Sequence, residues 1–198
     1  MVLPEAAFDV GDSGSFDAHW GEISGRNRIY VVVAYHDSQN PGNRLGVYGP
    51  DGGRVATYTK THLVPFAEPY PAGDGAVVQF DVDGVRVGVL ICQDDNFSDL
   101  WHAHALTGTQ LMVVPVFEGP PEVAPYHYRN SLLRTLEEPM ALVRAATDGT
   151  SAVIAPGARV VAFRNHPTQG TGVVIANVPY DSAIPFSTKS SSTHGCAN

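Results

Sequence analysis

Runs of apolar residues alternate with short polar turns along the chain, and this alternation predicts its secondary structure. The β-branched run Ile29–Ala34 predicts a buried strand, and Gln110–Phe117 predicts another, because strands buried on both faces read as continuous apolar segments. Three further pairs of segments flank turns typical of hairpins, at Asp51-Gly52-Gly53, Asp83-Gly84 and Pro156-Gly157. The paired strands are Leu45–Tyr48 with Arg54–Thr59, Val77–Val82 with Val85–Ile91, and Ser151–Ala155 with Arg159–Phe163, and a last single strand is expected over Thr171–Val178.

Helical patterns occur at two places between these strands. Ser98 predicts the N-cap of a short helix that ends at Gly108. A longer helix is expected over Tyr126–Thr147, where Pro139 should produce a kink or an interruption, and Gly149 should end it. Hairpins mixed with strand–helix–strand units predict a layered α/β fold with a mixed sheet.

Composition and charge narrow the class of protein. The chain has 198 residues, 43% of them hydrophobic, which suffices for one domain with a sizeable core. Its net charge of -8 and its scattered Lys and Arg argue against a nucleic-acid partner. No apolar run approaches the roughly 18 residues of a membrane span, and the first residues lack the pattern of a signal peptide. We therefore expect a cytoplasmic domain over residues 1–186, or a membrane-associated or periplasm-facing one if it is part of a larger protein, and a flexible Ser-rich tail over 187–198.

A lone cysteine, Cys92, stands where an apolar run meets the polar turn Gln93–Asn96. At the end of a strand and just before a helix, backbone N–H groups and the helix dipole favour the thiolate, so we expect its pKa to be lowered. The same N–H groups can hold an oxyanion. Taken alone, burial as a small apolar side chain accounts for Cys92 at least as well. The other cysteine, Cys196, lies in the tail and allows one disulfide at most.

Two other stretches place charged residues among apolar, aromatic and proline residues. Glu5 follows a proline in LPEAAF, and Lys60 precedes the aromatic, proline-rich loop of YTKTHLVPFAEPYPAG, with Glu68 eight residues later. Each of these residues alone is most simply a solvated surface residue. The ordered set PE, K-x-H-L-x-P-F-x-E and I-C-x-D, however, resembles the nitrilase or carbon–nitrogen hydrolase superfamily. The resemblance runs from Leu3 to about Val178 through ALTGTQLMVVPVF and R-A-x-x-x-G-x-S-A-x-I.

Within that superfamily the chain is most similar to the catalytic domain of apolipoprotein N-acyltransferases. HLVPFAEPYP, PYHYRNSLLRTLEEPMALVRAATDG and IPFSTK carry this resemblance. It implies a four-layer α-β-β-α fold in which the first strand and helix, normally ahead of Glu5, are missing, so that a sheet edge is left unpaired. The chain departs from that branch at Gln93-Asp94 and in VFEGPP, Val116–Pro121, and both departures put a lipid substrate in question.

The resemblance also implies roles for residues. Cys92 is the nucleophile, Glu5 the general base, Lys60 the electrostatic partner and Glu68 a supporting glutamate. The N–H of Gln93 would help to hold the oxyanion. A thioester acyl-enzyme would then pass its acyl group to water or to an amine, without a metal or an organic cofactor. The substrate would be a small amide, a nitrile or an acyl donor, with a lipoprotein as one possible acceptor.

Three aromatic residues are candidates for the substrate pocket, although core packing accounts for each equally well: Phe66, Tyr70 and Phe117. The resemblance also implies a homo-oligomer, and we expect Trp101 and Tyr128 at its contact.

Other classes of function are weaker readings of the same residues. Cys92 with His127 would suggest a cysteine–histidine protease, but no protease signature surrounds the cysteine. His102 and His104 with Cys92 would suggest zinc, but residues two apart on a helix do not face the same way. A non-catalytic remnant kept for assembly or binding is the alternative of another class.

Overall fold

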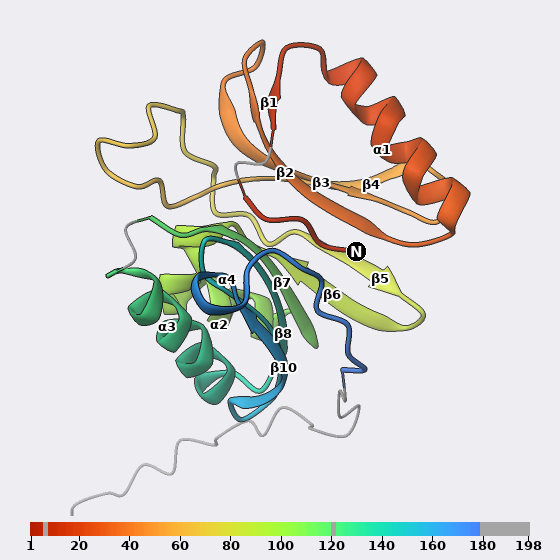
Figure 1. Ribbon diagram of the computed structural model, residues 1–198. Helices are drawn as coiled ribbons and strands as arrows, with labels where there is room; N and C mark the ends of the chain where they lie inside the picture. Colours follow the sequence, from red (N-terminus) through yellow and green to blue (C-terminus); the bar gives the residue numbers. More distant parts are fainter. Residues whose placement is uncertain (6–7, 120–121, 179–198) are drawn as a thin grey trace, which may run out of the picture.

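The computed structural model describes residues 1–5, 8–119 and 122–178, and these form two β-sheets packed face to face. Helices cover the outer faces of both sheets, so the layers follow the order α-β-β-α (Figure 1). The main core lies between the sheets, where Val32, Leu45 and Val47 of one sheet pack in the same cluster as Val89 and Met112 of the other. The predicted four-layer fold is therefore confirmed. The tail expected over 187–198 lies outside the described residues.

The first sheet has four strands in the order β1-β2-β3-β4, and α1 packs on its outer face (Figure 1). Trp20 of the helix packs against Val31, Val33 and Tyr48 of the sheet. The bounds are β1 Asp9–Val10, α1 Ser13–Asn27, β2 Val31–Asp37, β3 Gly42–Tyr48 and β4 Arg54–Thr59.

The second sheet has six strands in the order β10-β9-β8-β7-β6-β5. Its central strands β6, β7 and β8 are parallel, and the outer pairs are antiparallel. The strands are β5 Gln79–Val82, β6 Val85–Val89, β7 Leu111–Phe117, β8 Ala141–Thr147, β9 Thr150–Ala155 and β10 Arg159–Asn165. The helices are the 3₁₀ helix η1 Cys92–Asn96, α2 Ser98–Leu106, α3 Ala124–Glu137 and the short α4 His166–Gln169.

The three predicted hairpins are confirmed as the pairs β3/β4, β5/β6 and β9/β10. The long helix predicted over Tyr126–Thr147 is wrong in its second half. The helix ends at Glu137, two residues before Pro139, and the chain then forms the parallel strand β8. A proline cannot continue the hydrogen-bond ladder of a helix, and the β-branched and apolar run after it fits a buried strand. The last strand predicted over Thr171–Val178 is also wrong, because these residues form no strand.

Helix α1 was not predicted from the sequence. Its buried face consists of Trp20, Gly21 and Ser24, so it carries little of the apolar periodicity that reveals a helix. Its start does have a local signal, since the Asp12 side chain accepts a hydrogen bond from the N–H of Gly14 at 3.1 Å.

Ahead of α1, the first residues of the chain lie along the free edge of β2. Leu3 donates its N–H to the carbonyl of Val32 at 3.0 Å, and Val32 donates to the carbonyl of Met1 at 2.9 Å. This parallel bridge occupies part of the edge that we expected to be unpaired. Within the described residues no helix has both the length and the apolar character needed to cross a membrane.

Candidate active site

Cys92 occupies a sharp turn at the carboxyl end of the second sheet's central strands. It follows the buried residues Leu90 and Ile91 after β6 and begins η1. Its φ of 44° lies in the left-handed region, which is costly for a residue with a side chain, by about 1–3 kcal/mol. The side chain is buried, and its Sγ donates to the carbonyl of Phe117, 3.4 Å away at the end of β7. A strained turn that aims a thiol at a neighbouring strand end is typical of a functional position.

Lys60 lies directly after β4 of the first sheet and is 1% exposed. Its Nζ is 2.8 Å from Oε1 of Glu5, and 3.0 and 2.9 Å from the two carboxylate oxygens of Glu68. An ammonium group has three protons. Because the two contacts with Glu68 can share one proton, one N–H remains for a substrate oxygen. Lys60 therefore keeps a buried positive charge between two carboxylates.

Glu5 is fixed from three directions. Its Oε1 accepts from Lys60 and from Nδ2 of Asn43, at 2.7 Å, and its Oε2 accepts the N–H of Phe117 at 2.9 Å. The strand end at Phe117 thus holds Glu5 by its N–H and Cys92 by its carbonyl. This shared backbone brings together residues that are 112 and 25 positions away from Phe117.

Asn43 is a site residue that the sequence did not reveal. It lies on β3, is 1% exposed, and also donates to Oε1 of Glu68 at 2.5 Å. A polar side chain buried this completely needs partners, and both of its partners are site carboxylates. Asn43 precedes the strand predicted over Leu45–Tyr48 and is followed by the charged Arg44, so no local signal in the sequence marks it.

Glu68 supports Lys60 from the loop after β4. Burial alone would raise the pKa of its carboxyl, but the N–H of Val64, at 2.6 Å, and the charge of Lys60 together hold that pKa below its ordinary value. Burial likewise acts to lower the pKa of Lys60, and the negative charges of Cys92 as a thiolate, of Glu5 and of Glu68 raise it. Both groups are therefore ionised at neutral pH.

The expected lowering of the Cys92 pKa is wrong. Burial raises the pKa of the thiol well above its ordinary value, and the carboxylate of Glu5 raises it further. Lys60 opposes this rise without reversing it. The side chain of Cys92 is therefore a protonated thiol at neutral pH.

Asp94, in the turn after Cys92, connects the two loops that carry the thiol and the lysine. It is fully buried. Its Oδ1 accepts the N–H of His62 at 2.6 Å, and its Oδ2 accepts the hydroxyl of Tyr58 at 2.8 Å and the N–H of Ile91 at 3.3 Å. His62 follows Lys60 by two residues, so this carboxylate ties the Lys60 loop to the Cys92 turn.

The structure places the candidate pocket residues at different depths. Phe66 is exposed and has a φ of 67°, whereas Tyr70 is half-buried with its ring 5.0 Å from that of His36. Phe117 contributes its backbone to the site while its side chain is 47% exposed. The backbone N–H of Gln93 has no hydrogen-bond partner among the described residues, so it is available to an oxyanion.

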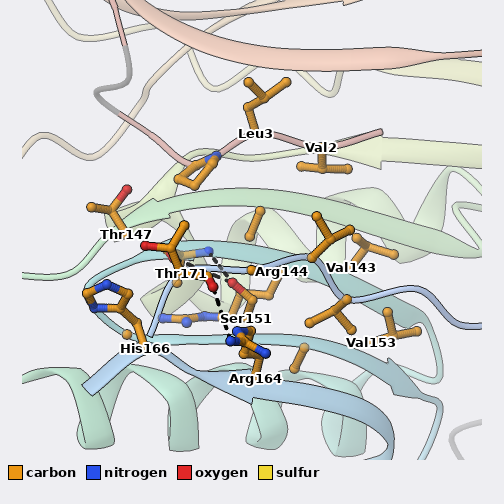
Figure 2. A pocket seen from close by; sticks show the side chains of 18 of the residues that line it. Val2, Leu3, Val143, Arg144, Thr147, Ser151, Val153, Arg164, His166 and Thr171 are labelled. Atoms are coloured by element: carbon orange, nitrogen blue, oxygen red, sulfur yellow. Dashed lines mark hydrogen bonds between the residues drawn. The ribbon is translucent and has the colours of Figure 1, made fainter. Parts of the chain in front are cut away.

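A cavity of about 610 Å³ lies elsewhere, between the first residues of the chain and the second sheet (Figure 2). Val2 and Leu3 face Val143 and Val153 across it. None of the catalytic candidates lines it.

The positions of the histidines argue against a cysteine–histidine protease and against a zinc site at Cys92. The ring of His127 contacts the carbonyl of Cys92, at 3.1 Å, rather than the thiol, so it cannot serve as the base of a cysteine–histidine protease. His104 is buried next to Thr109, and His102 is exposed and contacts Glu138. No cluster of three metal-ligating side chains occurs among residues 1–5, 8–119 and 122–178.

The predicted oligomer contact also needs correction at one residue. Trp101 is fully buried, and its Nε1 donates to Oδ1 of Asp95 at 3.0 Å. It therefore belongs to the core rather than to a surface. Tyr128 is half-buried on α3 and stays a candidate for that contact.

Comparison with known proteins assigns the family. The model of the carbon–nitrogen hydrolase family matches residues 5–186, and the chain therefore belongs to that family. It is 33% identical to an apolipoprotein N-acyltransferase of Gloeobacter violaceus over 161 residues, which are 68% of this chain and 30% of that protein. It is 28% identical to a deaminated glutathione amidase of Escherichia coli O157:H7 over 135 residues, 58% of this chain and 52% of that protein.

A solved structure shares the fold. An amidase mutant from Nesterenkonia sp. AN1, with the acetamide moiety of fluoroacetamide bound to its active-site cysteine, superposes with a TM-score of 0.75 at 18% identity. The match covers 83% of this chain and 72% of that one. The chain spans about a third to a half of the two curated relatives, so their activities do not transfer to it directly.

Proposed function

We propose that the protein hydrolyses an amide through a thioester formed on Cys92. One observation carries the proposal: Glu5, Lys60 and Cys92 come from three distant segments and converge on one point. Lys60 Nζ lies 2.8 Å from Glu5, and the backbone of Phe117 holds both Glu5 and the thiol. The site thus combines a nucleophile, a base and a fixed positive charge.

The first half of the reaction forms the acyl-enzyme. Glu5 takes the proton of Cys92 as Sγ attacks the carbonyl carbon, and the π-electron pair of the carbonyl moves to oxygen. The oxyanion is stabilised by Nζ of Lys60 and by the N–H of Gln93. When the oxyanion collapses, the carbon–nitrogen bond breaks, and Glu5 gives its proton to the leaving amine.

The second half regenerates the thiol. Glu5 removes a proton from water, whose oxygen attacks the thioester carbon. The carbon–sulfur bond then breaks, the carboxylic acid leaves, and the proton on Glu5 returns to Cys92. The raised pKa of the thiol agrees with this cycle, because the thiol is protonated before the attack and Glu5 removes its proton during the attack.

Acyl transfer to an amine is the second candidate. It is favoured by the 33% identity with an N-acyltransferase over 68% of the chain. In that reaction an amine replaces water in the second half, with the same roles for Cys92 and Glu5.

The test uses the Cys196→Ser variant as the parent, so that Cys92 is the one thiol. We expect p-nitrophenyl acetate or a short aliphatic amide to add one acyl group to Cys92, detected by mass spectrometry after a denaturing quench. Cys92→Ala and Glu5→Gln in the same background should show neither the adduct nor turnover. Turnover that survives in Cys92→Ala would overturn the proposal. Adding an amine and measuring the ratio of amide to acid product separates transfer from hydrolysis.

A further inference from the structure

Behind Cys92 lies a second group of buried polar side chains that the proposed reaction does not use. Glu118 directly follows β7, Arg144 lies on β8, Asp95 lies in η1, and His127 lies on α3. Each is less than a tenth exposed. Buried charges of this kind need partners, and here they are one another's partners.

The ring of His127 lies between two groups that accept hydrogen bonds. Its Nε2 is 3.1 Å from the carbonyl oxygen of Cys92, and its Nδ1 is 3.2 Å from Oε2 of Glu118. A carbonyl oxygen has no proton to give, so Nε2 must donate. A carboxylate also only accepts, so Nδ1 must donate whenever Glu118 is ionised.

Glu118 is held in the ionised form. Burial acts to raise the pKa of its carboxyl, but the hydrogen bond from His127 and the charge of Arg144 bring that pKa below its ordinary value. Its other oxygen, Oε1, accepts from the guanidinium of Arg144. A Cβ at position 149 would overlap Glu118, so Gly149 leaves the space in which this carboxylate sits.

The charges of the group balance when both carboxylates are ionised and His127 is a cation. Both oxygens of Asp95 accept, from Trp101 and from Ser131, and Oδ2 lies 4.0 Å from Nε2 of His127. Burial raises the pKa of the Asp95 carboxyl, and His127 is the largest of the influences that oppose this rise. Asp95 and Glu118 then match Arg144 and a doubly protonated His127.

We propose that His127 is a positioning residue that keeps an imidazolium against the carbonyl of Cys92 and thereby strengthens the oxyanion donor. The inference rests on the proposed function. The carbonyl of Cys92 and the N–H of Gln93 belong to the same peptide group. A charged donor on that oxygen polarises the peptide and makes the N–H a stronger donor, as in a cooperative chain of hydrogen bonds. The same bond helps to hold Cys92 at its strained φ of 44°.

The first measurement is the protonation state of the parent protein. A long-range ¹H–¹⁵N correlation spectrum near neutral pH should show both ring nitrogens of His127 protonated, with the signature of an imidazolium. The spectrum of His127→Gln, which lacks these signals, assigns them. A neutral ring with one pyridine-type nitrogen would overturn the inference, whether or not the variant folds.

The second measurement is acylation of Cys92 by p-nitrophenyl acetate under single-turnover conditions. The amide of a glutamine can still donate to a carbonyl but carries no charge. We therefore expect His127→Gln to slow the acylation step about tenfold, less than the 10²–10³ that follows loss of a whole oxyanion donor. The half-saturating concentration of the ester should stay unchanged. The matched control, His102→Gln at an exposed position of α2, should acylate at the parent rate.

The outcomes separate the two proposals. Failure of the parent to form any adduct at Cys92 would overturn the proposed function, while the nitrogen signals of His127 still decide its charge. An acylating parent whose rate His127→Gln leaves unchanged would overturn the inference alone. A change confined to the half-saturating concentration would also overturn it, since that result indicates a role in binding.

Discussion

Replacement of Asp94 by asparagine perturbs a buried carboxylate that joins the Lys60 loop to the Cys92 turn. Asparagine keeps the shape of the side chain and one acceptor oxygen, but it puts an NH₂ group where the other oxygen was. The groups around Asp94 are mainly donors: the N–H groups of His62 and Ile91 and the hydroxyl of Tyr58. The new NH₂ must therefore face at least one of them.

The magnitude follows from which partners can adapt. The hydroxyl of Tyr58 can turn to Oγ1 of Thr61, 3.0 Å away, and then accept from the new NH₂. The backbone N–H groups of His62 and Ile91 have no such freedom, and one of them is left buried without an acceptor. Since a hydrogen bond to a charged group contributes about 1.5–3 kcal/mol, and an unmet buried donor adds to the loss, we expect destabilisation by about 3 kcal/mol. At 2–4 °C per kcal/mol for a chain of this size, the melting temperature should fall by roughly 6–12 °C.

The assay is urea unfolding followed by circular dichroism, with Asp83→Asn as the control. Asp83 is exposed in the turn between β5 and β6 at a φ of 51°, which asparagine tolerates, so its replacement should change the free energy of unfolding by less than about 0.5 kcal/mol. Iodoacetamide labelling of the folded Asp94→Asn variant reports whether the Cys92 turn has moved. Destabilisation below 1 kcal/mol, or equal to that of the control, would refute the view that Asp94 holds the two loops together.

Three further predictions concern the charges of the site. With Cys196→Ser as the parent, iodoacetamide should label Cys92 in the folded protein more slowly than in the urea-unfolded chain at the same pH, because burial and Glu5 raise the thiol pKa; faster labelling would contradict that direction. Lys60→Met should abolish turnover and lower the free energy of unfolding by about 3–5 kcal/mol, since Glu5 and Glu68 are then buried without a cation, and urea unfolding with full stability would contradict the ion-pair geometry. The lowered pKa of Glu68 contributes stability that is complete above its ordinary value of 4.5 and is lost as the pH falls through the folded-state pKa, so acid unfolding of Glu68→Gln should depend less steeply on pH than that of the parent.

The elements that the sequence predicted correctly share a strong local signal. The hairpins at Asp51-Gly52-Gly53 and Asp83-Gly84 carry turn residues between apolar strands, and both formed as expected. Helix α1 could not be predicted from the apolar pattern, because its buried face is made of Gly21, Ser24 and a single tryptophan, Trp20. The helix predicted through Tyr126–Thr147 merged two elements because apolar residues continue past Pro139, and only parallel pairing with β7 shows that the second half is a strand.

The sequence predicts only those parts of the candidate site that are formed by side chains within recognisable motifs. Glu5, Lys60, Glu68 and Cys92 follow from the order of short motifs, and the structure places all four side by side or on one shared strand end. The backbone of Phe117 does as much positioning as any of them, and a backbone group leaves no trace in the sequence. Asn43 and His127 are single polar residues whose role depends on burial, which tertiary packing decides.

Burial first, and then the charges of the two groups on either side of Cys92, keep its thiol protonated. On one side Lys60 faces two carboxylates, so this group carries a net negative charge that disfavours a second anion on sulfur. On the other side Arg144 and His127 are matched by Glu118 and Asp95, so no cation is left over for the sulfur. In the proposed reaction, negative charge would therefore develop on the substrate oxygen rather than on sulfur. One N–H of Lys60 is available there, together with the N–H of Gln93, which has no partner within the described part of the chain. Such a site would stabilise the oxyanion that forms during the attack more than the thiolate that exists before it. Because only interactions that are stronger in the transition state than in the resting enzyme speed a reaction, this arrangement would lower the barrier to acylation.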